Sequence, residues 1–366
     1  MLTDVGLWCV LLSYRKQEAQ KMANDRIPVE VVFNPNWWFH NYAISFDESF
    51  YFDKEVRIQN DVIMRQAMHE RFGLDEENLQ PRPIIGSMHV AGGFVMPALF
   101  GVEIKFAKNE APWPVPSNLS KDEIFALEVP DIEATWPMDR LIADMDALED
   151  EFGYVVGDFD TDGILNTAIH LREQQLFIDF FDDPDLVHHL FTILAETYVL
   201  VANHMKSRTG TCAVATNRSI LHVDPKIYLH SNCSVQMVSP AIYEEFLLPY
   251  EQYLAERLQP YGIHHCGNNL HIFAEAYSKV PAVFYDIGWG SDVAKCREAF
   301  PDAFLNLRLS PIRMLQQTSD EIRKDTEQLL LAVGSLEKVG VCCINMDYGT
   351  PDENVMAMLE AVESFR

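Results

Sequence analysis

Positive charge is scarce in this sequence of 366 residues, which has 28 Lys and Arg against 55 Asp and Glu and a formal net charge of −27. So large an excess of acid repels the phosphate backbone of nucleic acids, and we do not expect the protein to bind DNA or RNA. The charge suits solubility in a crowded cytoplasm, and a docking face for a basic partner protein is the alternative. Charge alone does not choose between them.

Long hydrophobic runs are also missing. The apolar run near the start, "LWCVLLSY" at 7–14, is too short to span a bilayer. It follows an aspartate rather than a basic region, and it lacks the small-residue cleavage site of a signal peptide. We therefore expect a cytoplasmic protein without a membrane segment.

Several chemical signatures are absent. The seven cysteines do not form a disulfide framework, because their number is odd and the chain is long. Thiols in a reducing compartment are then free to bind metal. The sequence has no P-loop, no G-x-G-x-x-G after a strand and no G-x-S-x-G elbow, which argues against nucleotide use and serine hydrolysis.

Short apolar strands alternate with helical segments over more than 200 residues, from about residue 137 to the end. This alternation predicts a parallel sheet in an α/β fold. The length suits a (β/α)8 TIM barrel, with an open doubly wound sheet as the alternative. We assign 1–366 to a single barrel domain, with an N-terminal extension and loop region at about 1–136. A helix is expected over 1–28.

Polar residues gather where the predicted strands end. In a barrel, the carboxyl ends of the strands carry the functional side chains. The polar residues at these ends are Asp158, Asp160, Asn232, His264, Cys266, Asp286, Arg308, Cys343 and Asn345.

The segment "GIHHCG" at 262–267 gives the clearest chemical pattern. Side chains alternate along a strand, so His264 and Cys266 point one way and His265 points the other. An imidazole and a thiol at one strand end suit zinc, which usually takes at least three protein ligands. Of Cys342 and Cys343 in the last strand, one faces inward and can supply the third. Burial in the core is the alternative, because cysteine is among the most buried residue types.

Four segments resemble the uroporphyrinogen decarboxylase superfamily. They are "NDRIPVE" at 24–30, "MVSPAIYEEFLLPY" at 237–250, "HHCGN" at 264–268 and "GTPDENVMAMLEAV" at 349–362. The resemblance follows the chain in order and is strongest from about residue 153 onward. This superfamily contains decarboxylases and zinc-dependent, corrinoid-linked methyltransferases.

The resemblance implies the methyltransferase branch. The decarboxylases carry an arginine-rich segment after the R-x-P-V pattern, which holds the porphyrinogen carboxylates, but here "VVFNPNWWFHN" at 31–41 contains no arginine. The methyltransferases carry His-x-Cys and a distal Cys as zinc ligands. His264 and Cys266 match the first pattern and Cys343 the second, although a shift of one residue would substitute Cys342.

The implied cofactors are Zn²⁺ and a corrinoid (cobalamin). The corrinoid is expected on a partner protein, because the chain lacks the Asp-x-His-x-x-Gly signature of the cobalamin module. The favoured reaction is O-demethylation, in which a methyl group passes from a methoxylated donor, aromatic ones included, to cobalt(I). The alternatives are methylation of a small thiol by a methyl-corrinoid, porphyrinogen decarboxylation, and a structural zinc site in an assembly partner.

Five residues are candidates for substrate binding. Trp37, Trp38 and His40 follow the first predicted strand and can wall a pocket, with ordinary packing as the alternative. Asn232 and Asn345 follow later strands and are expected to face the site.

Two aspartates are candidates for catalysis. Asp160 and Asp286 end strands and can orient a substrate or a metal-bound group, or can instead cap the helices that follow. Cys233 is a spare candidate ligand for which burial is the expected alternative.

Overall fold

The computed structural model describes residues 27–365, except 75–78, 91 and 212–216, so most of the helix expected over 1–28 lies outside the described residues. Within them, parallel strands form a six-stranded sheet of order β1-β10-β9-β8-β7-β6 and a two-stranded sheet β2-β5. The strands are β1 Val29–Phe33, β2 Ile84–Gly86, β5 Val156–Asp158, β6 Tyr228–Ser231, β7 Tyr261–His265, β8 Ala282–Ile287, β9 Phe304–Arg308 and β10 Val339–Met346.

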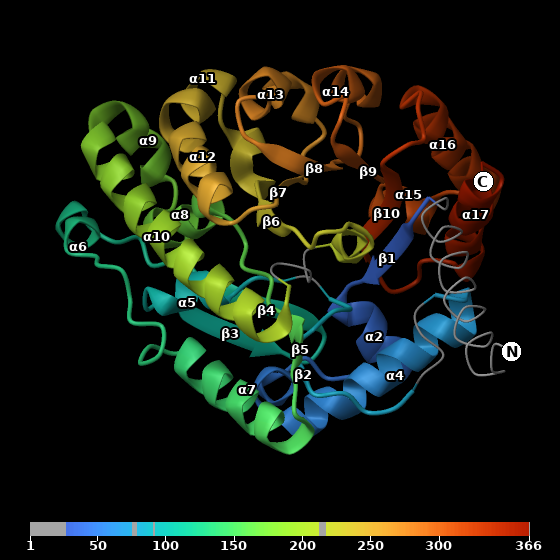
Figure 1. Ribbon diagram of the computed structural model, residues 1–366, viewed down its shortest axis with the longest axis horizontal. Helices are drawn as coiled ribbons and strands as arrows, with labels where there is room; N and C mark the ends of the chain where they lie inside the picture. Colours follow the sequence, from blue (N-terminus) through green and yellow to red (C-terminus); the bar gives the residue numbers. More distant parts are fainter. Residues whose placement is uncertain (1–26, 75–78, 91, 212–216, 366) are drawn as a thin grey trace, which may run out of the picture.

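This arrangement confirms the α/β fold with a parallel sheet, and the closed barrel stays a prediction. The six-stranded sheet curls into a half-barrel (Figure 1), and the described residues contain no ladder from β1 to β2 or from β5 to β6. Both β1 and β2 come from the region that the sequence assigns to an extension and loops. An antiparallel hairpin of β3 Glu103–Ala107 and β4 Glu110–Val115 follows them.

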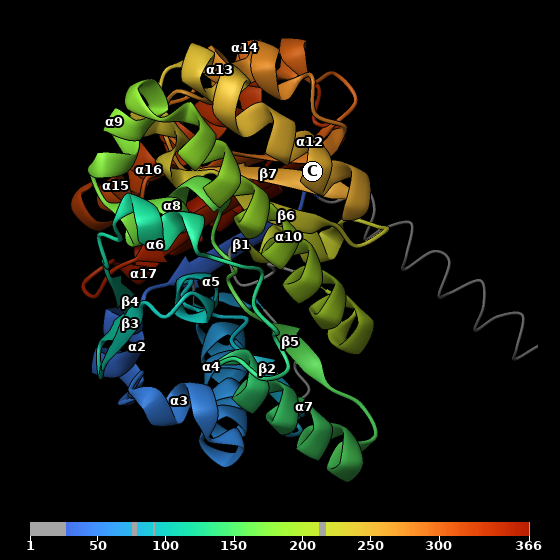
Figure 2. The ribbon, with the colours of Figure 1, turned by 90° about the vertical axis from the view of Figure 1, so that its left-hand side faces the viewer.

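Helices cover the outer faces of the sheets (Figure 1), and α2 lies against β4 at one side of the molecule (Figure 2). The helices are α2 Pro35–Tyr42, α3 Glu48–Phe52, α4 Lys54–Phe72, α5 Val95–Leu99, α6 Lys121–Phe125, α7 Met138–Phe152, α8 Ile164–Arg172, α9 Gln175–Asp182, α10 Pro184–Thr209, η1 Arg218–His222, η2 Cys233–Met237, α11 Pro240–Ile242, the π-helix η3 Tyr243–Leu247, α12 Leu248–Arg257, α13 Leu270–Tyr277, α14 Val293–Ala299, α15 Pro311–Gln316, α16 Ser319–Ala332 and α17 Asp352–Glu363.

The helix α10 is long and apolar enough to cross a membrane by length and composition, but 61% of its most apolar window is buried inside the protein. It packs against α8, α9 and α12. That burial is typical of the core helix of a soluble protein.

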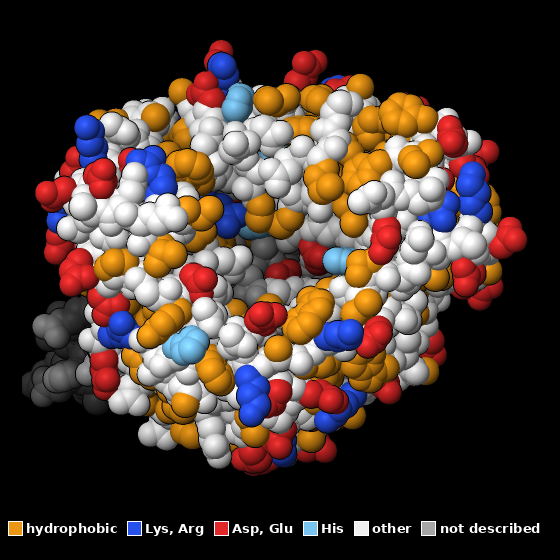
Figure 3. All heavy atoms as spheres, turned by 180° about the vertical axis from the view of Figure 1, so that it is seen from behind, with side chains coloured by type: hydrophobic (Ala, Val, Ile, Leu, Met, Phe, Trp, Pro, Cys, Tyr) orange, Lys and Arg blue, Asp and Glu red, His pale blue; other side chains and the backbone are white. Residues whose placement is uncertain are grey.

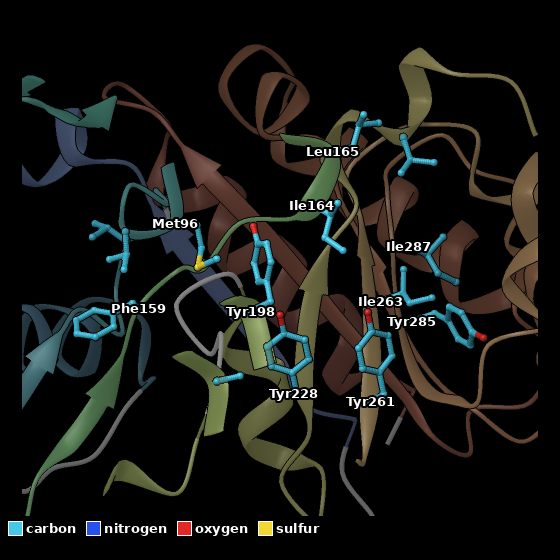
Figure 4. Packing of buried hydrophobic residues seen from close by; sticks show 14 of the residues in the cluster. Met96, Phe159, Ile164, Leu165, Tyr198, Tyr228, Tyr261, Ile263, Tyr285 and Ile287 are labelled. Atoms are coloured by element: carbon cyan, nitrogen blue, oxygen red, sulfur yellow. The ribbon is translucent and has the colours of Figure 1, made fainter. Parts of the chain in front are cut away.

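The outer face of the six-stranded sheet is held by a row of tyrosines. Tyr228 of β6 lies in register with Tyr261 of β7, and their ring centroids are 5.6 Å apart. Tyr285 of β8 lies on the same face, in register with Ile263 of β7 (Figure 4). The Tyr261 hydroxyl donates to the buried carboxylate of Glu251 in α12. These contacts fix the register of the strands whose ends carry the site.

The inner face is closed toward the amino ends of the strands by a small apolar cluster of Ile220, Ile227, Leu229 and Phe284. Polar side chains lie on the carboxyl side of this cluster. The arrangement leaves the carboxyl ends of the strands as the open end, as in a barrel enzyme.

A buried ion-pair network holds the segment before β2 against α4. Asp61 of α4 accepts hydrogen bonds from Arg65 Nε (2.9 Å) and from Arg82 Nε and Nη2 (both 2.8 Å). Arg65 also donates to the carbonyl of Gln80 at 2.8 Å. The network therefore positions β2, which pairs with β5 and so places the polar residues that follow β5.

Replacing Asp61 by Ala should lower the free energy of unfolding by about 3–5 kcal/mol, because the buried Arg65 guanidinium loses that carboxylate. The control Asp352→Ala removes the partner of Arg71, a pair whose side chains are 29% and 39% exposed, and should cost about 1 kcal/mol or less. Urea denaturation followed by circular dichroism measures both variants. Equal, small losses would show that the Asp61 network does not hold the fold.

Candidate metal centre

Three metal-ligating side chains converge at the ends of β6 and β7. One donor atom each from Cys233, His264 and Cys266 lies within 4.8 Å of the other two. Cys233 Sγ is 2.9 Å from Cys266 Sγ, which is 2.8 Å from His264 Nε2. Strand pairing explains the cluster: Ser231 is in register with His264, so the cysteine two residues beyond each reaches the same level.

His265 points to the opposite face, as the alternation along the strand predicts. Its Nδ1 is 2.8 Å from the Tyr277 hydroxyl and its Nε2 is 2.9 Å from Asn269 Oδ1. Burial lowers the pKa of His265 to about 4, so this imidazole stays neutral. His265 therefore belongs to the packing between the sheet and α13.

His264 is oriented from behind by Asp286. Its Nδ1 donates to Asp286 Oδ2, and Asn306 Nδ2 donates to Asp286 Oδ1 at 3.0 Å. This leaves Nε2 facing the two thiols. Metal-binding histidines are commonly held in this way, because a carboxylate on the second nitrogen fixes the tautomer and the ring.

The charges in the cluster favour a thiolate. The thiol of Cys233 donates to Cys266, and this bond, with His264 and Arg308 nearby, holds the pKa of Cys266 well below its usual range despite burial. Arg308 Nη1 lies 3.3 Å from Cys266 Sγ. Burial would lower the pKa of His264, but the Cys266 thiolate and Asp286 raise it to about 10.

The donor set fits zinc. Two sulfurs and one nitrogen are ligands that zinc prefers, at about 2.3 Å for sulfur and 2.0–2.1 Å for nitrogen. Atoms bound to one tetrahedral zinc lie about 3.5 Å apart, so the contacts of 2.8–2.9 Å would open by less than about 1 Å. The ion would displace the protons of Cys233 and His264 Nε2. All three side chains line a cavity, which leaves a coordination position for a substrate.

This cavity has a volume of about 600 Å³ and opens at the carboxyl ends of the strands, where Figure 3 shows a hollow with acidic side chains in it. Its walls come from segments far apart in the sequence. Besides the three ligands and Arg308, they include Asn34, Asn36, Gly92, Asn109, Glu110, Asp160, Asp162, Ser231, Ile344, Asn345 and Asp347.

Two aspartates form one wall. Asp160 accepts hydrogen bonds from the backbone N–H groups of Gly92 and Asp162, both at 3.0 Å. Asp162 has a φ of 61° and accepts a bond from Asn166 Nδ2. Burial and the charge of Asp160 raise the pKa of Asp162 to about 8, so Asp162 keeps its proton near neutral pH.

The uroporphyrinogen decarboxylase (URO-D) family matches residues 91–365. The chain belongs to this family. A solved methyltransferase from Methanosarcina mazei is similar in fold, with a TM-score of 0.67, 18% identity and coverage of 93% of this chain and 94% of that one. No curated protein sequence matches the chain. The superfamily resemblance of the sequence is thus confirmed, and the branch stays a prediction.

The third member of the cluster in this URO-D protein, Cys233, is not the residue that the sequence predicts as the third ligand. Cys343 lies on the outer face of β10, where its thiol contacts the carbonyl of Leu309 at 3.7 Å in the main core. Cys342 faces inward, but its sulfur lies 3.0 Å from Asn306 Nδ2 and packs beside Val32. Neither belongs to the cluster, because β9 and β8 separate β10 from β7.

The aromatic candidates do not line the cavity. Trp37 and Trp38 are 1% and 0% exposed, and Trp37 stacks on Phe33 with ring centroids 3.8 Å apart. His40 is exposed and packs against Tyr348 at 4.5 Å. Ordinary packing, the alternative to a pocket wall, therefore describes these three residues better. From the same segment, Asn34 and Asn36 line the cavity instead.

The polar candidates divide. Asp160 and Asn345 line the cavity, whereas Asp286 lies behind His264. Asn232 is 4% exposed and donates its side-chain N–H to Glu251 in the core. The sequence did not single out Asp162, although "DTDG" at 160–163 repeats an acid just after a strand.

Replacing Cys233 by Ser should abolish metal retention, because a cluster ligand is lost. The matched control Cys343→Ser also alters a buried thiol but should keep one metal ion per chain. Metal content after dialysis against a weak chelator, measured by mass spectrometry, checks both variants. Loss of metal from Cys343→Ser alone would restore the assignment made from the sequence.

Replacing Asp162 by Asn should remove a loss of folding stability that the native protein shows as pH rises. The native carboxyl holds its proton up to a pKa of about 8, against an ordinary value of 3.8, so the native state binds more protons between these values and loses stability as pH rises. The advantage of the Asn variant should therefore grow from about pH 5 to about pH 8. Urea denaturation with a chelator present throughout measures it. An advantage that stays constant with pH would contradict this assignment.

Proposed function

We propose that this URO-D family protein is a zinc-dependent methyltransferase, which moves a methyl group between a small substrate in the cavity and a corrinoid on a partner protein. The observation that carries the proposal is the cluster of Cys233, His264 and Cys266, with His264 oriented by Asp286 and an open side toward the cavity. The related fold of a methyltransferase agrees with it.

Bound zinc would act as a Lewis acid on the oxygen or sulfur of the substrate that carries or receives the methyl group. The residues of the chain hold it. Two thiolates balance its charge, Asp286 keeps the Nδ1 proton on His264, and Arg308 lies within 3.9 Å of Asp286, so the buried charges are paired.

We favour the demethylating direction. In it, the cobalt(I) corrinoid of the partner would supply the electron pair of the new cobalt–carbon bond. The pair of the broken carbon–oxygen bond would stay on oxygen, which would take a proton. Asp162 lines the same cavity, and in the metal-free protein burial and the charge of Asp160 raise the pKa of its carboxyl to about 8, so it is the candidate general acid. Methylation of a thiol releases a proton instead and needs no acid. The buried Trp37 and Trp38 give no support to an aromatic donor.

A protein partner is supported by apolar side chains at the same end of the strands. Trp289, Ile312 and Tyr348 are 40%, 64% and 52% exposed, and they follow β8, β9 and β10. Exposed apolar side chains gathered on one face are typical of interaction surfaces. Docking there would bring a corrinoid to the mouth of the cavity.

Porphyrinogen decarboxylation is disfavoured by the charge of the cavity. Glu110, Asp160 and Asp347 line it, and Arg308 is the single Lys or Arg among the described lining residues. Arg308 already faces the Cys266 thiolate. A substrate with many carboxylates would meet repulsion here.

The zinc-loaded protein should convert cob(I)alamin to methylcob(III)alamin with a compound from a panel of methoxylated donors, followed by visible absorbance. Asp162→Asn should slow this transfer by about 100-fold while zinc content is kept, because general acid catalysis typically contributes that much or more. Transfer from methylcob(III)alamin to thiols, without demethylation, would establish the thiol alternative. Absence of both reactions in zinc-loaded protein would refute the proposal.

A further inference from the structure

A β-bulge in β10 aims one polar side chain into the cavity. Val31 of β1 lies opposite Cys343, and Phe33 lies opposite Met346, so β10 has one extra residue between these points. Asn345 sits in this stretch with a φ of 63°, in the left-handed region. Bulges of this kind re-aim side chains next to functional sites, and the left-handed conformation costs energy that Asn and Asp tolerate best.

The bulge separates Asn345 from its neighbours. Ile344 and Met346 are 2% and 0% exposed, whereas Asn345 is exposed and lines the cavity. Within the described part of the chain, its carboxamide has no hydrogen-bond partner. A primary amide offers two N–H donors and a carbonyl acceptor, so Asn345 presents both kinds of group to a ligand.

Two more asparagines meet at the same mouth from other segments. Asn36 Nδ2, at the start of α2, donates to Asp347 Oδ1 at 2.9 Å. Asn109 Nδ2, from the β3–β4 turn, donates to Asn36 Oδ1 at 3.2 Å. In these two bonds the Asn36 carbonyl already accepts one hydrogen bond, and the carbonyl of Asn109 stays available as an acceptor for a ligand. The lining of the mouth is thus rich in neutral carboxamides.

We propose that this asparagine mouth, formed by Asn36, Asn109 and Asn345, binds the edge of a corrin ring through amide–amide hydrogen bonds. The inference rests on the proposed function. A corrin ring carries primary carboxamides around its edge, and each matches an asparagine in donors and acceptors.

Size determines where the ring lies. A cavity of about 600 Å³ is of the size that holds drug-sized ligands, and a corrin with its amide arms is larger. The ring would therefore lie across the mouth, and the small substrate would lie deeper, beside Cys233, His264 and Cys266. Neutral amides suit this contact because they recognise the uncharged ring edge despite the acidic side chains of the cavity.

Asn345→Gly tests the inference, because glycine keeps the left-handed backbone and removes the amide. The matched control is Asn118→Gly, at another exposed asparagine with a φ of 48° that does not line the cavity. In the transfer assay with free cob(I)alamin, Asn345→Gly should raise the cobalamin concentration for half-maximal rate about 5- to 10-fold, the effect of one or two lost hydrogen bonds. Zinc content and the KM of the methyl donor should not change, and Asn118→Gly should match wild type.

Equilibrium dialysis with methylcob(III)alamin gives a second readout that needs no turnover. Weaker binding by Asn345→Gly than by wild type and Asn118→Gly would support the inference even if no donor is found. Equal binding would overturn it, and so would a change in the KM of the donor alone. Failure of the zinc-loaded wild type to transfer methyl in either direction would instead refute the proposed function.

Discussion

The register among β6, β7 and β8 is the constraint on which the site depends. Ser231 pairs with His264 and His264 with Asp286, so one row across three strands sets both the ligand and the carboxylate behind it. A slip of one residue in a strand turns every side chain to the other face. The tyrosines on the outer face oppose such a slip, because Tyr261 donates to the Glu251 carboxylate and Tyr285 donates to the carbonyl of Tyr277, and a slip would break these buried bonds. Packing on the outside of the sheet therefore protects the chemistry on the inside.

The charges around the cavity are compatible with a bound dication. The protein is strongly acidic, and the thiolate of Cys266 lies in a cavity whose other wall carries Asp160 and Asp162. Without a metal, the compensation comes from Arg308, from the proton on His264 and from protons kept on Cys233 and Asp162. Each of these groups keeps its proton because further negative charge in the buried cluster would be unfavourable. A bound cation changes that local balance and lets the thiols ionise, so metal binding and proton release are coupled.

The alternation of side chains along a strand and the positions of the strand ends made part of the candidate site predictable. From the sequence alone they indicated that His264, Cys266 and Asp160 lie at the carboxyl ends of the strands. Placing Cys233 in the cluster required two further facts, namely that β6 is the neighbour of β7 and that the chain turns into η2 after Asn232. Cys343 lies outside this cluster, and its side could not be predicted because two adjacent cysteines in an apolar run do not reveal which of them faces inward.

At the tryptophans, the residues that begin a helix are a better guide to structure than the aromatic content of the segment. Asn34 accepts a bond from the N–H of Trp37 and Pro35 occupies the first turn, so a helix begins directly after β1. Trp37 and Trp38 then fall on the buried side of α2, while Asn34 and Asn36 reach the cavity. An aromatic run after a strand suggests a pocket wall only if the chain stays a loop there. The cap and the proline indicate that it does not.

Backbone strain points to the same cavity from two sides. Asp162 follows β5 and Asn345 ends β10, and both are non-glycine residues in the left-handed region that line the cavity. Glycine would adopt this conformation at lower cost, and stability alone would favour it there. Left-handed backbone alone does not mark a ligand site, because Asn118 and Lys338 also have positive φ and do not line the cavity. At Asp162 and Asn345 the strained backbone coincides with a polar side chain that does line it. In the proposed transfer, Asp162 would supply a proton to the departing oxygen and Asn345 would bind a neutral amide, so both strained residues would act on one reaction.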